Sequence, residues 1–185
     1  MQNSFHLQAK ARYYYRKECF NLKHIISVLV NNQAGVLSRV SGLFSRRGFN
    51  IDSLAVGTTN IPEISRMTIV VDGDDNIVDQ VQKQLSKLID VIKVVRLDAE
   101  NSVSRELALI KVRADTSVRS EIMQIAEVFR ANIVDISKDT LTIEISGSSK
   151  KAEAMYEMLR PFGILEDART GLLSLERGAK TILDD

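Results

Sequence analysis

The sequence predicts an α+β protein made of two tandem ferredoxin-like βαββαβ domains. Short apolar runs typical of strands alternate twice with longer segments whose apolar residues recur at helical spacing. A polar stretch without periodicity, 99–104, separates the two series and is predicted to be a linker. Arg130-Ala131-Asn132-Ile133 follows the first helix of the second series as Arg47-Gly48-Phe49-Asn50-Ile51 does in the first. The sequence therefore predicts two domains of the same topology.

The first domain is expected over 22–98. Its predicted order is strand 24–31, helix 35–47, strands 50–58 and 62–71, helix 74–88 and strand 91–98. The first helix has an apolar stripe of Val36, Leu37, Val40, Leu43 and Phe44, and the second has one of Ile77, Val81, Leu85 and Leu88. Gly48 suits the left-handed conformation that ends a helix.

The second domain is expected over 105–180, followed by a tail, 181–185. The predicted elements are strand 105–113, helix 117–130, strands 132–137 and 140–146, helix 148–160 and short strands through 164–176. The residues before the first domain, 1–21, are basic and aromatic without periodicity, and we expect a flexible extension. A docking or nucleic-acid arm is the alternative for that segment.

The turn before the first helix is the main candidate site. It reads Asn31-Asn32-Gln33-Ala34-Gly35. Because Gly35 has no side chain, a ligand can approach the backbone, and the first N–H groups of a helix form a site for a carboxylate or phosphate. The amides of Asn32 and Gln33 supply further donors and acceptors, so a small zwitterion would fit. An ordinary polar turn is the alternative reading.

The corresponding turn of the second domain differs. It reads Arg113-Ala114-Asp115-Thr116-Ser117, lacks glycine, and places an anion where a ligand carboxylate would dock. We expect no amino-acid site there and assign this domain to contact with another subunit.

Composition excludes several classes of function. The 185 residues carry a formal net charge of +1, which gives no argument for nucleic acid or an anionic membrane as partner. A single cysteine, Cys19, cannot form an internal disulfide, and no apolar run reaches the roughly 20 residues of a membrane helix. A cytoplasmic location is the expectation.

No catalytic or metal-binding signature is present in the sequence. His6 and His24 are the only histidines, and neither belongs to a nucleophile or metal-ligand motif. Asp72, Asp74 and Asp75 lack the further oxygen ligands of a cation loop and are better explained as a loop with a helix N-cap. RNA-recognition domains share the βαββαβ order, but the first and third strands here lack the aromatic residues that stack on bases.

Longer stretches carry a family resemblance. Residues 32–40 (NQAGVLSRV), 42–54 (GLFSRRGFNIDSL), 65–69 (SRMTI) and 84–91 (QLSKLIDV) closely resemble the small, regulatory subunits of acetolactate synthase (acetohydroxyacid synthase). The resemblance covers about 22–180 and identifies the first domain as an ACT domain. It implies a non-catalytic subunit that binds and stimulates a catalytic subunit carrying thiamine diphosphate, Mg and FAD, and that confers feedback inhibition by valine. This chain itself is expected to hold no cofactor.

The same resemblance implies that ACT domains pair as a homodimer with the effector between them. The site residues carried over are Asn32, Gln33, Ala34, Gly35, Val36 and Leu37 from one chain with Asn50 and Ile51 from the other. We expect N–H groups of Gly35 to Leu37 to bind the carboxylate, and oxygens of Asn32 and Asn50 to bind the ammonium. Leu37 and Ile51 would enclose the side chain of valine, leucine or isoleucine. A free-standing ACT-type amino-acid sensor acting on another partner is the alternative.

Overall fold

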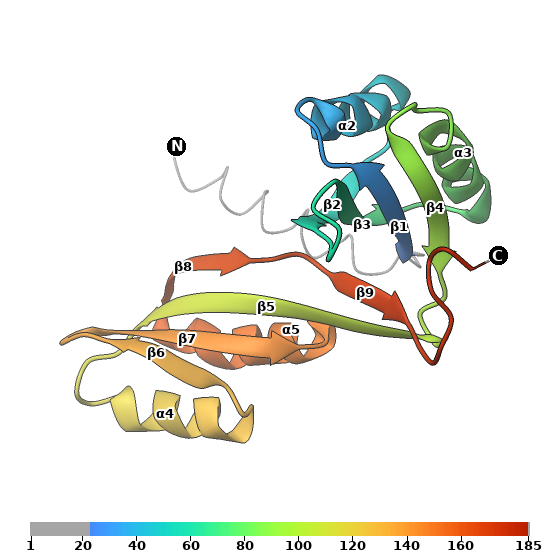
Figure 1. The fold of residues 1–185 in the computed structure, drawn as a ribbon. Coiled ribbons are helices and arrows are strands. Elements are labelled where there is room, and N and C mark those ends of the chain that lie inside the picture. The colour runs from blue at the N-terminus through green and yellow to red at the C-terminus, as the bar shows by residue number, and fades with distance from the viewer. Residues whose placement is uncertain (1–22, 185) are drawn as a thin grey trace, which may run out of the picture.

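The computed structural model describes residues 23–184 and contains two α+β domains, each with a sheet and two helices (Figure 1). The elements of the first are β1 (Lys23–Asn31), α2 (Val36–Arg47), β2 (Ile51–Thr58), β3 (Ile64–Asp72), α3 (Asp75–Leu85) and β4 (Val91–Leu97). Its four strands are antiparallel in the order β2-β3-β1-β4, so β2 and β4 are the edges. The predicted βαββαβ order is confirmed.

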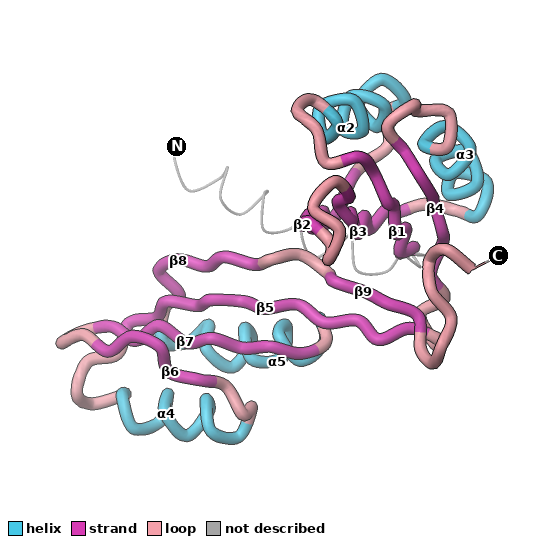
Figure 2. The backbone as a smooth tube through the Cα atoms, viewed as in Figure 1, coloured by secondary structure: helices cyan, strands magenta, loops and turns pink. Residues whose placement is uncertain are grey.

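The second domain repeats this order and adds a strand. Its elements are β5 (Ser102–Arg113), α4 (Arg119–Val128), β6 (Asn132–Ile136), β7 (Thr140–Gly147), α5 (Ser149–Leu159), a 3-10 turn (Arg160–Phe162), β8 (Ile164–Arg169) and β9 (Leu173–Glu176). The strand order is β6-β7-β5-β8, and β9 pairs with the first part of β5. Both domains place their two helices on one face of the sheet (Figure 2).

The boundary between the domains differs from the sequence prediction. β5 starts at Ser102, so the last three residues assigned to the 99–104 linker are strand. Ser102 pairs with Glu176 and Ser104 with Ser174, about 70 residues later in the chain. Because a short polar segment shows no periodicity, this pairing with a distant strand is not visible locally.

Each domain has its own apolar core. In the first, Ile26, Val28 and Val30 of β1 pack against the helices, and Phe44 of α2 is fully buried. One residue of the predicted helix stripes was placed wrongly, because Leu37 is 45% exposed. The other stripe residues pack in or against the core, with Ile77 and Leu88 partly buried. Val78, in the first turn of α3, is a further buried residue that the stripe did not include.

The segment joining β8 to β9 lies against the first domain. The backbone N–H of Leu172 donates to the hydroxyl of Ser53 on β2 at 3.0 Å. Gly171 has φ +79°, and a Cβ there would stand 2.7 Å from the Ser53 Oγ. The contact therefore requires glycine at position 171.

None of the helices formed by residues 23–184 is long and apolar enough to cross a membrane. The predictions made for the 1–21 extension, including His6 and Cys19, fall outside the described residues.

Candidate functional site

The start of α2 is open, as the glycine-containing turn predicted. Gly35 is the N-cap, with φ +85° and ψ −9°, and no side chain caps the helix. The first turn carries no acidic residue. A residue with a Cβ adopts this left-handed conformation only with strain, so glycine is needed for the turn itself as well as for access to the backbone. The helix dipole therefore meets no negative charge from α2 at this end.

The N–H groups at this helix start are unequally available. Val36 N–H already donates to the Gln33 carbonyl, with a long N···O distance of 3.3 Å. Within the described chain, the N–H groups of Gly35 and Leu37 donate to no protein acceptor. The expectation that all three N–H groups are free for a carboxylate is corrected for Val36, whose bond a ligand would have to replace.

Asn32 anchors the turn to the loop between β2 and β3. Its backbone N–H donates to the Glu63 carbonyl at 2.7 Å, and its side-chain NH2 donates to the Pro62 carbonyl at 2.8 Å. The amide orientation that makes this bond leaves the Oδ1 oxygen as an acceptor. The side chain is thus held in a fixed position with its oxygen available to an ammonium group.

Arg39 is a part of this region that the sequence analysis did not include in the site. Its Nε donates to Asp90 Oδ2 at 2.6 Å, and Asp90 is only 8% exposed. Its Nη1 lies 3.2 Å from the position that a Cβ on Gly35 would occupy. A guanidinium group therefore stands beside the open helix start. The partner carboxylate is 51 residues away in sequence, so no local signal indicated the pair.

Asn50 and Ile51 lie at the other end of the first sheet. β3 pairs Ile64 with Asn31 and Val71 with Ile51, so the two halves of the predicted site are seven residues apart along one strand. At a rise of about 3.3 Å per residue this is roughly 23 Å. Asn50 donates its side-chain NH2 to Asp52 Oδ1 at 2.8 Å, which leaves its own oxygen as an acceptor. One chain does not bring the two halves together.

The second domain shows what a closed version of the same turn looks like. Asp115 Oδ1 accepts from the backbone N–H of Ser117 at 2.8 Å and from its hydroxyl. The hydrogen bonds from Ser117 hold the pKa of Asp115 below its ordinary value. Arg119 donates to the carbonyls of Ala114, Ser137 and Lys138 and ties the turn to the β6–β7 loop.

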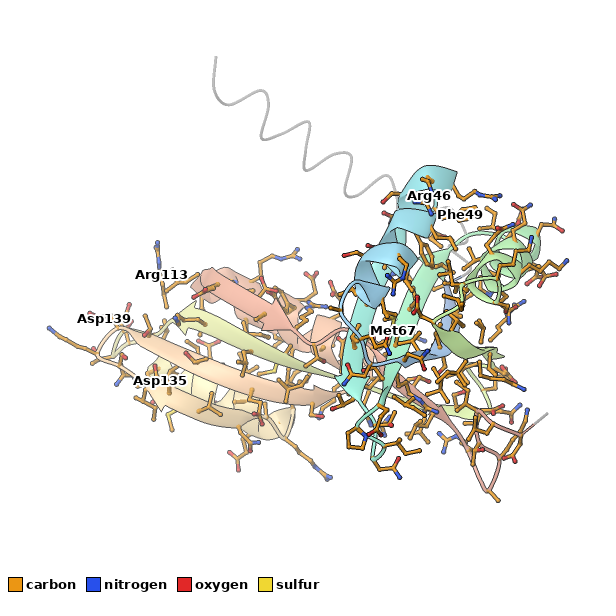
Figure 3. The ribbon with its side chains drawn as sticks, turned by 45° about the horizontal axis from the view of Figure 1, so that its top comes forward. Arg46, Phe49, Met67, Arg113, Asp135 and Asp139 are labelled. Carbon is orange, nitrogen blue, oxygen red and sulfur yellow. The ribbon has the colours of Figure 1, made fainter. Side chains whose placement is uncertain are left out.

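In the second domain a carboxylate of the chain itself thus binds within the turn that precedes α4, while the N-cap of α4, Val118, has no side-chain cap. Arg113 and Asp139, which flank this region, lie at the end of the second domain that is far from the first (Figure 3). The expectation that this turn binds no amino acid stays a prediction.

The acidic loop 72–75 has a structural role. Asp74 is the N-cap of α3 and accepts from Ile77 N–H at 2.9 Å, which confirms the helix-cap interpretation. Asp75 pairs with Arg96 at 2.7 Å, and His24 Nε2 lies 3.0 Å from the Gly73 carbonyl oxygen. Within 23–184 no group of three or more His, Cys, Asp or Glu side chains is arranged to hold a metal ion.

The fold defines a class of protein: an ACT-type domain joined to a second ferredoxin-like domain. Residues 26–93 match the family model of the AHAS small subunit-like ACT domain, and residues 105–178 match that of the small subunit of acetolactate synthase. The chain therefore belongs to the acetolactate synthase small subunit family.

Relatives from bacteria and archaea support this assignment. An acetolactate synthase small subunit from Mycobacterium bovis is 55% identical over 159 residues, which cover 86% of this chain and 95% of that protein. A probable small subunit from Archaeoglobus fulgidus is 54% identical, with 86% and 99% covered. The crystal structure of the small subunit from Thermotoga maritima superposes with a TM-score of 0.80, at 44% identity, over 85% of this chain and 99% of that one.

Proposed function

We propose that this chain is the regulatory subunit of an acetolactate synthase: it binds the catalytic subunit, stimulates it, and confers feedback inhibition by valine. The observation that carries the valine part is the uncapped, glycine-opened start of α2, with Asn32 fixed beside it. Family membership supports the catalytic subunit as partner. Thiamine diphosphate, Mg and FAD belong to that subunit in this proposal, and the small subunit works in the cytoplasm without a cofactor of its own.

The effector site is completed by a second copy of the chain. β2 is an edge strand, so it can pair with another strand through its free side. If two β2 strands pair antiparallel about a two-fold axis, the start of one lies beside the end of the other. The end of β2 is at the same edge of the sheet as the 31–35 turn, because Thr58 pairs with Ser65 and Asn31 with Ile64. Such a homodimer would bring Asn50 and Ile51 to the partner's helix start.

Each polar group of the effector then has a distinct binding partner. The carboxylate is bound by the N–H groups of Gly35 and Leu37, with Val36 N–H released from Gln33 and the positive charge of Arg39 nearby. The ammonium is bound by the oxygens of Asn32 and Asn50. Leu37, which is exposed in one chain, and Ile51 enclose the aliphatic side chain. Ala34 and Gln33 form the outer wall of the turn.

Inhibition follows if valine favours one arrangement of the dimer. A ligand shifts an equilibrium only by its difference in affinity for the two states, and a site made by two chains has different geometry whenever the dimer changes. The binding free energy of one small amino acid thereby changes the geometry of the dimer, and the catalytic subunit responds to that geometry.

Reconstitution tests the proposal directly. The purified chain is mixed with the catalytic subunit, and acetolactate formation is measured with valine, leucine or isoleucine added. We expect stimulation by the chain and inhibition strongest with valine. Absence of both stimulation and sensitivity would contradict the proposal.

The alternative is a free-standing ACT-type sensor that acts on another partner. The chain would then bind a branched-chain amino acid in calorimetry but would neither bind nor stimulate the catalytic subunit. Co-purification of the two subunits separates the two functions.

A further inference from the structure

A pocket separate from the start of α2 lies between the helix-free face of the first sheet and the C-terminal segment. It has a volume of about 630 Å³, within the range of roughly 300–1,000 Å³ typical of small-molecule sites. Its walls are largely apolar and come from both domains, and they include Leu29, Ile64, Ile92, Leu173, Leu175 and Ile182. None of the residues proposed to bind valine lines it.

One residue gives this pocket its charge. Arg66 of β3 is the only charged residue that the described part of the chain, 23–184, contributes to its lining. The side chain is half-buried, and within residues 23–184 it makes no hydrogen bond or ion pair. Burial lowers the pKa of its guanidinium from the ordinary value, because it removes water from the charged form. A partly desolvated and unpaired cation is costly, and an anion would relieve that cost.

The neighbours of Arg66 leave room for a ligand. Directly across on β2 stands Gly57, and no atom lies within 4 Å of the place where its Cβ would be. On the other side Arg66 pairs with Leu29 of β1. Thr68, two residues further along the same face of β3, also lines the pocket and adds a hydroxyl. Arg66 thus has no side chain beside it at the paired position on β2 and the apolar Leu29 at the paired position on β1.

We propose that this pocket binds a small organic carboxylate with an aliphatic body and no ammonium group. Arg66 would hold the carboxylate through paired N–H donors, and the leucine and isoleucine walls would cover the carbon chain. No Asp or Glu among residues 23–184 lines the pocket, so an ammonium group would be desolvated without a counter-charge from this part of the chain. The pocket therefore selects against amino acids, whereas the proposed valine site requires one. The two sites differ in ligand class and in position.

Three ligands with the same carbon chain test this selectivity. Hexanoate carries the carboxylate alone, hexanamide is its neutral counterpart, and norleucine adds the ammonium. The full chain is first loaded with the fluorescent sulfonate 8-anilinonaphthalene-1-sulfonate, an anion with an aromatic body, and each compound is titrated as a competitor. We expect hexanoate to displace the dye at a concentration roughly tenfold or more below the other two, the factor of one charge-assisted contact. Saturating valine should leave dye binding unchanged.

Variants at Arg66 assign the effect to this pocket. Arg66→Gln should raise the hexanoate midpoint roughly tenfold and remove the difference from hexanamide, while Arg66→Lys should keep part of it. Arg46→Gln is the matched control, because Arg46 is an exposed arginine at the end of α2 (Figure 3). It should behave like the unmodified chain. Circular dichroism checks that each variant folds, and Arg66→Lys carries the test if Arg66→Gln does not fold.

Equal midpoints for the three compounds, dye binding that does not saturate, or hexanoate binding indifferent to Arg66 substitution would each overturn the inference. None of these outcomes bears on valine inhibition of the reconstituted enzyme, so the pocket and the proposed function fail independently.

Discussion

At the scale of single residues, the two domains build the turn before their first helix in different ways. Neither α2 nor α4 has a side-chain cap at its N-terminus. In the first domain Gly35 brings no side chain to the turn, whereas in the second the carboxylate of Asp115 accepts two hydrogen bonds from Ser117. One residue therefore decides whether the turn already holds a carboxylate of the chain.

Replacing Gly35 with Asp should abolish valine inhibition while leaving stimulation of the catalytic subunit intact. Position 35 has φ +85°, and the new carboxylate would stand near Arg39 Nη1, in the place of the ligand carboxylate. We expect the valine concentration for half-inhibition to rise roughly a hundredfold or more, as two charge-assisted hydrogen bonds are lost. Inhibition curves of the reconstituted enzyme measure this, and valine sensitivity equal to that of the unmodified chain would refute the site. Gly48→Asp has a comparable left-handed φ of +68° at the other end of α2 and is the control.

Asp115 should contribute to stability in a pH-dependent way. Its pKa is lowered in the folded state by the hydrogen bonds from Ser117, so its contribution is present above the unfolded pKa of about 3.9 and is lost as the pH falls through the folded value. Asp115→Ala should therefore lower the urea midpoint at pH 6, and the difference from the unmodified chain should shrink as the pH falls below 4. A difference that does not change with pH would assign the effect to packing.

At the scale of elements, the contact between the β8–β9 connection and β2 links the two domains. Ser53 lies two residues after Ile51, next to an irregularity in the β2–β3 pairing between these residues. A ligand that moves the start of β2 would therefore also move Ser53, whose hydroxyl accepts the hydrogen bond from Leu172 N–H. The second domain is thereby in direct contact with β2, two residues away from Ile51 of the proposed effector site.

Gly171→Ala should break this contact. The added Cβ would meet Ser53 Oγ at 2.7 Å, and the left-handed backbone adds a strain of about 1–2 kcal/mol. Gly178→Ala separates the two effects, because Gly178 has φ +76° but no atom within 4 Å of its Cβ position. We expect faster hydrogen exchange at Leu172 in the first variant only. Equal exchange in both variants would mean that strain, and not the Ser53 contact, controls this loop.

At the scale of the whole molecule, the free edge of β2 is the surface on which the proposed homodimer depends. Val56 on this strand is 46% exposed, although it is apolar and pairs with the buried Met67. An exposed apolar edge strand is open to pairing with another strand. The position of Val56 suits a residue at the interface between the first domains of two chains.

Val56→Lys should dissociate the homodimer. A lysine on an edge strand opposes strand pairing through its charge and its hydration. Analytical ultracentrifugation should show a monomer for this variant and a dimer for Val134→Lys, which changes an equally exposed valine on β6 of the second domain. Dimerisation that survives Val56→Lys would place the interface elsewhere, and valine binding by a monomeric variant would contradict a shared site.

The sequence predicted what local patterns determine. Apolar periodicity indicated both βαββαβ units, and glycine and aspartate at turns indicated the ends of α2 and α3. It did not predict contacts between residues that are far apart in the sequence. The Arg39–Asp90 pair, the pairing of Ser102 with Glu176, and the Arg66 pocket all join segments that periodicity treats separately. Leu37 was misplaced because it borders the apolar stripe, and helical spacing alone does not show where the core ends.

The roughly 23 Å between the two half-sites on one chain has a consequence for how such a sensor responds to its own abundance. Under the proposed function, an isolated protomer contributes one half of each of two effector sites and completes neither. Effector binding and dimerisation would then be linked by mass action, so that valine would strengthen the dimer and dilution of the dimer would weaken valine binding. The response would report the concentration of the polypeptide as well as that of the amino acid.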